Sequence, residues 1–95
     1  MVRYKPSRGD IISIGKGYTY FNLVFSHNSF NKKYIFAHTF PISNAKSANI
    51  FHVPLKIQNE QFYILTDRLQ TIDHSERSIS LVDICPSDIL EEALN

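Results

Sequence analysis

The stretch FYILTDRLQTIDHSER, residues 62–77, joins a segment that builds a core to a segment that carries chemistry. Residues 62–65 are apolar or aromatic, which is typical of a β-strand that contributes to a core. The sequence then turns polar, and no other window mixes core-forming and ionisable residues so densely. Its ionisable side chains are Asp67, Arg68, Asp73, His74, Glu76 and Arg77.

The length and composition indicate one small globular unit. A chain of 95 residues buries roughly 60 to 65% of its unfolded surface when it folds, so we expect a single domain over residues 1–95. Its apolar runs are far shorter than the roughly 18 residues of a membrane span, and the basic start, MVRYKPSRGD, lacks the apolar core of a secretory signal. A lone cysteine, Cys85, indicates a reducing compartment. These features predict a soluble cytoplasmic protein.

The formal net charge of +1 conceals a strong asymmetry along the chain. Residues 1–59 contain eight Lys and Arg but one acid, Asp10, whereas residues 60–95 contain two Arg and eight Asp and Glu. Such a distribution fits a protein that presents a basic surface to a polyanion. It fits equally well a fold in which the two parts neutralise each other.

Short alternating apolar segments predict a chain of six or seven strands. Segment 33–40 is rich enough in apolar residues to be a central strand covered on both faces, whereas Pro54 places segment 50–57 at an edge, because proline cannot donate a ladder hydrogen bond. Residues 27–31 predict one helical turn, and residues 41–49 an exposed loop of the kind that often carries binding residues. The predicted strands cover residues 10–14, 19–26, 33–40, 50–57, 61–65 and 78–84.

The end of the chain predicts a helix with Pro86 in its first turn. Its apolar stripe would consist of Ile89, Leu90, Ala93 and Leu94. Many short strands in so few residues favour closure into a small, strongly bent barrel, because closure removes exposed strand edges. The predicted fold is therefore mainly β, with small helices.

Five segments, in this order and spacing, resemble the MazF/PemK/Kid family of toxin endoribonucleases over nearly the whole chain. They are RGDII (8–12), LVFS followed by FN (23–31), FPIS (40–43), the D…TID…R pattern (67–77) and the final helix (86–94). The resemblance implies an SH3-like small β-barrel with a C-terminal helix and a homodimer. It also implies a metal-independent mRNA interferase that cuts single-stranded RNA, paired with an acidic antitoxin protein.

The resemblance is degenerate at the family's usual catalytic arginine. Family members carry a longer loop after the first strand that ends in Gly-x-Arg-Pro. Counting back from FN at 30–31 puts that arginine at Tyr20, and aligning on Gly17 puts it at Thr19. Two functions therefore stay open. One is the endoribonuclease, and the other is a catalytically silent SH3-like module or a protein poison resembling CcdB.

Candidate site residues follow from what RNA cleavage requires. Attack of a 2′-hydroxyl on the adjacent phosphate needs a proton acceptor, a proton donor and a cation or hydrogen-bond donor for the developing charge. Lys16 is expected to supply the cation, Ser43 a hydrogen bond to phosphate, and Asp67 a contact to a base or the orientation of a proton carrier. The candidates for RNA binding are Tyr18, Tyr20, His27, His38, Lys46 and Arg68.

Each catalytic candidate also has a purely structural interpretation. Lys16 is equally a solvated turn residue, Ser43 a turn cap, and Asp67 a turn residue paired with Arg68. His27 and His38 can exchange protons near neutral pH, but they are also ordinary surface residues. The histidines and Cys85 never adopt zinc-ligand spacing, so neither a metal nor a cofactor is expected.

Overall fold

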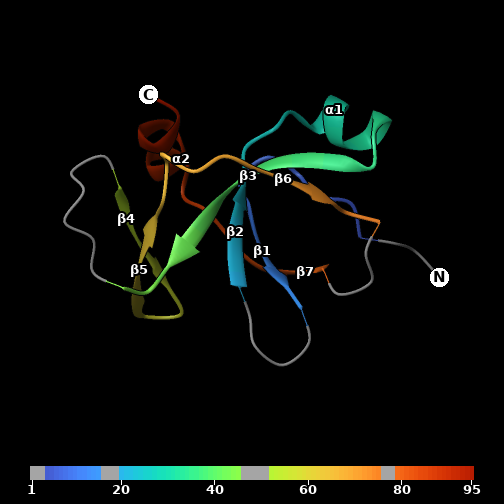
Figure 1. Ribbon diagram of the computed structural model, residues 1–95. Helices are drawn as coiled ribbons and strands as arrows, with labels where there is room; N and C mark the ends of the chain where they lie inside the picture. Colours follow the sequence, from blue (N-terminus) through green and yellow to red (C-terminus); the bar gives the residue numbers. More distant parts are fainter. Residues whose placement is uncertain (1–3, 16–19, 46–51, 76–78) are drawn as a thin grey trace.

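The computed structural model describes residues 4–15, 20–45, 52–75 and 79–95 (Figure 1). Within these ranges the chain forms a mainly β fold with two short helices. The elements are β1 (Asp10–Ile14), β2 (Tyr20–Val24), α1 (Asn28–Lys33), β3 (Phe36–Ser43), β4 (Val53–Ile57), β5 (Glu60–Ile64), β6 (Gln70–Asp73), β7 (Ile79–Ile84) and α2 (Ser87–Leu94). Neither helix in these ranges has the length and apolar character to cross a membrane.

All strand pairs between described residues are antiparallel, and β3 takes part in three of the six. The strands follow the order β4-β5-β3-β2-β1-β7, while β6 pairs with β3 outside this path. The first half of β3 pairs with β6, and its last two residues pair with β5. Because β3 changes partner along its length, the sheet curls around it, as Figure 1 shows.

The curled sheet has apolar side chains on both of its faces. Adjacent residues of a strand point to opposite sides, so Ile11 and Leu23 join one cluster while Ile12 and Val24 join the other. The first cluster is the larger and includes residues of β4, β5 and α2. Fully burying a side chain of this kind stabilises the fold by about 1.5–3 kcal/mol, so β1 and β2 anchor both halves of the core.

The C-terminal helix packs as its sequence predicts. Ala93 is buried, and Ile89, Leu90 and Leu94 pack against the larger cluster. Pro86 occupies the N-cap position with φ of −56° instead of the first turn. Cys85 lies buried just before it, and burial raises the pKa of its thiol to about 11. The thiol is therefore neutral at physiological pH, as expected for a small apolar core residue.

The β3 region differs from its prediction. Helix α1 extends to Lys33, and Tyr34, Ile35 and Phe36 are 47%, 49% and 44% exposed, so the segment is not covered on both faces throughout. Buried His74 holds this exposed segment, because its Nε2 lies 2.7 Å from the carbonyl oxygen of Tyr34 and its backbone N–H donates to that of Ile35.

The predicted loop at 41–49 was also partly wrong. Pro41 and Ile42 continue β3 through their pairing with β2, and Ile42 and Ser43 pair with β5.

Strand β6 was not predicted at all, since its four residues alternate too briefly to be distinguished from a turn. The expectation for Pro54 is confirmed, since β4 lies at one end of the strand order. Residues 46–51 of the predicted loop and edge strand, and Ser78 of the predicted last strand, lie outside the described residues.

Candidate functional site

Asp67 lies in a tight turn that follows β5. The backbone N–H of Arg68 donates to the carbonyl oxygen of Leu65 over 3.0 Å, so the chain reverses at residues 65–68. The Oδ1 atom of Asp67 lies 2.7 Å from Nε2 of His52. The Asp67 side chain is 46% exposed and that of His52 is 9% exposed. A solvent-facing carboxylate is therefore backed by a nearly buried imidazole.

The β4–β5 hairpin brings these two side chains together. Gln58 and Asn59 form its two-residue turn with φ of 52° and 69°, the positive values that a tight hairpin of this hand requires. The register then pairs Val53 with Ile64. His52, immediately before Val53, consequently lies beside the turn that carries Asp67.

The electrostatics of this pair favour an ionised carboxylate. The hydrogen bond with His52 lowers the pKa of Asp67 below its usual value, against the opposing effect of burial, and the charges of His52 and Arg68 lower it further. The structural interpretation of Asp67 as a turn residue paired with Arg68 gains a second participant, because His52 makes the short contact. Arg68 acts on Asp67 through its charge.

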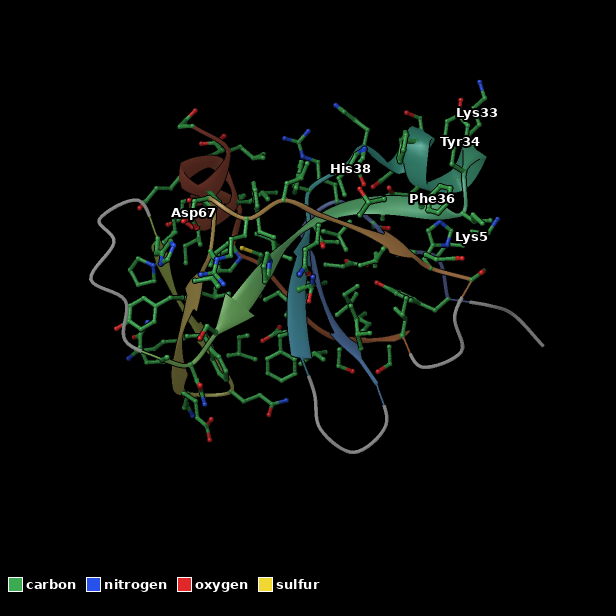
Figure 2. All side chains as sticks on the ribbon, in the orientation of Figure 1. Lys5, Lys33, Tyr34, Phe36, His38 and Asp67 are labelled. Atoms are coloured by element: carbon green, nitrogen blue, oxygen red, sulfur yellow. The ribbon has the colours of Figure 1, made fainter. Side chains whose placement is uncertain are left out.

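Asp67 and the preceding Thr66 line a hollow of about 530 Å³. Two aromatic residues, Phe25 and Phe40, also line it, with rings stacked 4.3 Å apart. The end of α2 closes one side with Ala93, Leu94 and Asn95. Figure 2 shows Asp67 beside this helix. The hollow therefore joins an anionic oxygen to flat apolar surfaces.

Ser43 lines a different hollow of about 360 Å³, together with Phe21, Pro41, Ile42, Asn44, Phe62 and Leu65. The rings of Phe21 and Phe62 lie 5.4 Å apart at its wall. The Oγ atom of Ser43 accepts a hydrogen bond from the N–H of Ala45, so Ser43 does cap a turn. Leu65 lines this hollow and Thr66 the other, so the two hollows are neighbours along the chain.

His27 and His38 line a third hollow of about 460 Å³. His38 stacks on Phe30 at 4.9 Å, and its Nδ1 lies 3.2 Å from Oγ1 of Thr71. Nε2 of His27 lies 3.4 Å from a guanidinium nitrogen of Arg8. This hollow shares Phe25 and Leu94 with the hollow of Asp67. The two histidines are thus brought together with each other, and not with Ser43.

The remaining sequence candidates are placed only in part. Lys16, Tyr18 and Lys46 lie outside the described residues, as do Thr19 and Arg77. Tyr20 begins β2 and pairs with Ile14, and its side chain is likewise outside the description. Arg68 is exposed next to Asp67. No three His, Cys, Asp or Glu side chains of the described ranges converge, so no metal site is assigned there.

His52 is the residue of this site that sequence reasoning missed. In the alternating pattern of segment 50–57 it is one polar position among several. A signal was present, because counting back from a turn at 58–59 pairs 57 with 60 and 53 with 64. Continued by one residue, that count pairs position 52 with position 65, two residues before Asp67.

The sequence matches the family model described as "PemK-like, MazF-like toxin of type II toxin-antitoxin system" over residues 5–95. No curated protein matches the sequence significantly.

Among solved structures, MazF in the MazE-MazF complex (Form-II) from Deinococcus radiodurans is 22% identical, with a TM-score of 0.84 over 96% of this chain and 89% of that one. A mycobacterial endoribonuclease solved with its cognate antitoxin is 16% identical, with a TM-score of 0.75 over 95% and 89%. The Mycobacterium tuberculosis toxin MazF-mt6 is 12% identical, with a TM-score of 0.74 over 90% and 88%. These likenesses match the predicted mainly β fold with a C-terminal helix. The chain belongs to the PemK-like, MazF-like toxins of type II toxin–antitoxin systems.

Proposed function

We propose that this chain is a cytoplasmic, single-domain toxin that cuts single-stranded RNA as a metal-independent endoribonuclease. The observation that carries the proposal is the solvent-facing Asp67 carboxylate, ionised and held at the rim of a hollow. The D…TID pattern of the family begins at this residue. Two similar mycobacterial structures are themselves described as endoribonucleases.

The reaction is a transesterification at one phosphate of the RNA. The 2′-oxygen forms a bond to phosphorus, the bond from phosphorus to the 5′-oxygen breaks, and a proton passes from the 2′-hydroxyl to the 5′-oxygen through the site. Asp67 orients the group that carries the proton. Ser43 donates to the phosphate, and Lys16 takes the place of the family arginine as the cation.

The RNA strand runs along residues 65–67, across both neighbouring hollows. Base–aromatic stacking contributes about 1–3 kcal/mol per base, and each hollow offers an aromatic pair, Phe21–Phe62 in one and Phe25–Phe40 in the other. The expected phosphate contacts are Lys46 and Arg68, with Tyr18 and Tyr20 as further stacking residues. One RNA strand on this path would contact both Ser43 and Asp67, although the two residues line different hollows.

The partner that restrains this toxin is an acidic antitoxin. Similar toxins are solved as MazE-MazF complexes and with a cognate antitoxin. An extended acidic segment can follow a groove that binds a polyanion, because it presents negative charge at similar spacing. Its binding should weaken with added salt and should compete with RNA.

We propose that a second copy of the chain binds to the outer surface of β3 and β6. Phe36 and His38 point to the same side of β3, and Thr71 pairs with His38 across the ladder. Leu69, two residues before Thr71, is 62% exposed, and Phe30 stacks on His38. We call these residues the β3–β6 face. Exposed apolar surface of this kind marks an interface, and a twofold axis through it would give a symmetric homodimer.

Incubation of the purified chain with a mixed-sequence RNA, with and without EDTA, tests the function. We expect cutting that EDTA leaves unchanged and that Ser43→Ala and Asp67→Asn each lower by about 100-fold or more. Salt-dependent RNA binding without cutting would instead identify a silent relative. Neither binding nor cutting would favour a protein poison, the class represented by CcdB.

A further inference from the structure

We infer that His52 is a positioning residue of the RNA-cleaving site, which fixes the orientation and the charge of Asp67 through their hydrogen bond. This role rests on the proposed function. The family resemblance assigns nothing to position 52. The two side chains are separated by 15 positions in sequence and joined by a contact of 2.7 Å.

The difference in burial decides which of the two side chains meets the substrate. His52 is 9% exposed, whereas Asp67 is 46% exposed. Asp67 lines the hollow, and His52 is absent from its lining among the described residues. His52 therefore acts through Asp67 and does not itself touch the RNA.

Orientation is the first thing that the contact supplies. An exposed aspartate on a turn samples several rotamers, so the rotamer that suits the reaction is populated for only a fraction of the time. A charge-assisted hydrogen bond from a nearly buried imidazole selects one of them. The backbone supports this arrangement, because the turn at residues 65–68 is closed by its own hydrogen bond and Leu65 donates to the carbonyl oxygen of Pro41 in β3.

Charge is the second thing that the contact supplies. A lone carboxylate repels the RNA phosphate, and this chain has no arginine at positions 19 or 20 to offset that repulsion. His52 offsets part of this negative charge through the hydrogen bond that also lowers the pKa of Asp67. The other groups around the hollow are apolar or neutral, namely Phe25, Phe40, Thr66, Ala93, Leu94 and Asn95. Besides Asp67, the described lining therefore carries no charged side chain. Arg68, in the same turn, also offsets the charge of Asp67.

Two substitutions separate orientation from charge. His52→Ala removes both, whereas His52→Gln keeps a side-chain N–H donor at about the position of Nε2 and removes the titratable charge. Lys56→Gln is the matched control, because Lys56 is exposed on β4, the strand that His52 precedes, and its replacement removes a charge away from Asp67. Circular dichroism and an unfolding curve establish that each variant is folded.

The first measurement needs no RNA. Carbon-detected NMR follows the carboxyl group of Asp67 through a pH titration in the parent and in each variant. We expect the midpoint in His52→Ala to return toward about 3.9, the usual value for aspartate, and the midpoint in His52→Gln to lie between those of His52→Ala and the parent. An unchanged midpoint in both His52 variants would overturn the inference.

The second measurement is single-turnover RNA cleavage from pH 5 to 8, at RNA concentrations that separate kcat from KM. His52→Ala should lower kcat by about 10- to 100-fold, the loss expected when a reacting group is misplaced by about 1 Å. His52→Gln should recover most of kcat, because it keeps a donor to Asp67, and the shape of its pH profile should differ from that of the parent. If His52 only stabilised the fold, its replacement would lower kcat without changing the shape of the pH profile. Glutamine would then restore kcat no better than alanine does.

The outcomes also separate this role from the proposed function. A parent protein that cuts no RNA overturns both. A parent that cuts RNA, together with His52→Ala that keeps the parental rate and pH profile, overturns the role of His52 alone. If His52→Ala does not fold, His52→Gln carries the test, and a glutamine variant with the parental pH profile is then the result that counts against it.

Discussion

Replacement of Asn31 by alanine should destabilise the whole fold, because this side chain ties three segments together. Asn31 is fully buried in α1. Its amide nitrogen donates to the carbonyl oxygens of Pro6 and Ser26 over 3.1 and 3.2 Å, and its Oδ1 accepts from the hydroxyl of Ser26 over 2.5 Å. The same hydroxyl accepts the backbone N–H of His38 in β3. One amide therefore holds the start of the chain, α1 and β3 in register.

The expected cost follows from these three hydrogen bonds. Each contributes about 0.5–1.5 kcal/mol net, and a buried group left without a partner costs about 1–3 kcal/mol. Asn31→Ala should therefore lower the free energy of unfolding by about 2–4 kcal/mol, a large share of the roughly 5–15 kcal/mol available to a small domain. In a domain of about this size that loss lowers Tm by about 4–8 °C for each kcal/mol.

Urea unfolding followed by circular dichroism measures the effect at one fixed protein concentration, because the proposed dimer would make apparent stability depend on concentration. Ser29→Ala is the control, since Ser29 is exposed in the same helix and its loss should change stability by less than about 0.5 kcal/mol. Ser26→Ala and the double variant complete a cycle, in which the shared bond should appear as coupling. A cost below about 1 kcal/mol for Asn31→Ala would refute the reasoning, since buried acceptors would then tolerate the loss of their donor.

Three further predictions concern charge and assembly. Asp67→Asn keeps the shape of the side chain, so RNA should still bind within about threefold in a filter assay while cutting falls by about 100-fold or more. Because His52 lowers the pKa of Asp67 in the fold, the pair stabilises the protein above about pH 4 and loses this effect as pH falls through the lowered value. The stability difference between parent and Asp67→Asn in urea titrations should therefore shrink on acidification, and a growing difference would contradict the pairing. Leu69→Asp should yield monomers at about 10 µM in sedimentation experiments, whereas Lys56→Asp should remain dimeric.

Local patterns were sufficient for much of the fold. The strand Asp10–Ile14 and the apolar stripe of α2 depend on short-range periodicity and were correctly predicted. Pro54 fixed the position of β4 at an edge by a single missing donor. The boundaries of β3 could not be found this way, because residues 41–43 become strand through their pairing with β2 and β5. Such pairing depends on segments about 20 residues away in either direction.

The candidate site shows the same division. Asp67 could be selected from its neighbours in sequence, but its partner required the hairpin register and the exposed fractions of the two side chains. Residue types alone offer no reason to separate Ser43 from His27 and His38, yet in the curled sheet they line different hollows. A pattern of residue types identifies chemistry more readily than it identifies distance.

The position of β3 between two sets of partners has a consequence for amide hydrogen exchange. Phe36 and His38 of the β3–β6 face lie in the first half of β3 (Figure 2). Ser43 is its last residue. An amide of β3 that donates to β2, β5 or β6 can exchange with solvent only when that partner strand separates from it, so the amides in the paired centre of β3 should exchange slowly. An antitoxin or a second copy that contacts one end of β3 should then slow exchange at the other. Deuterium uptake by β3 over hours would show whether binding at one end protects the amides at the other end.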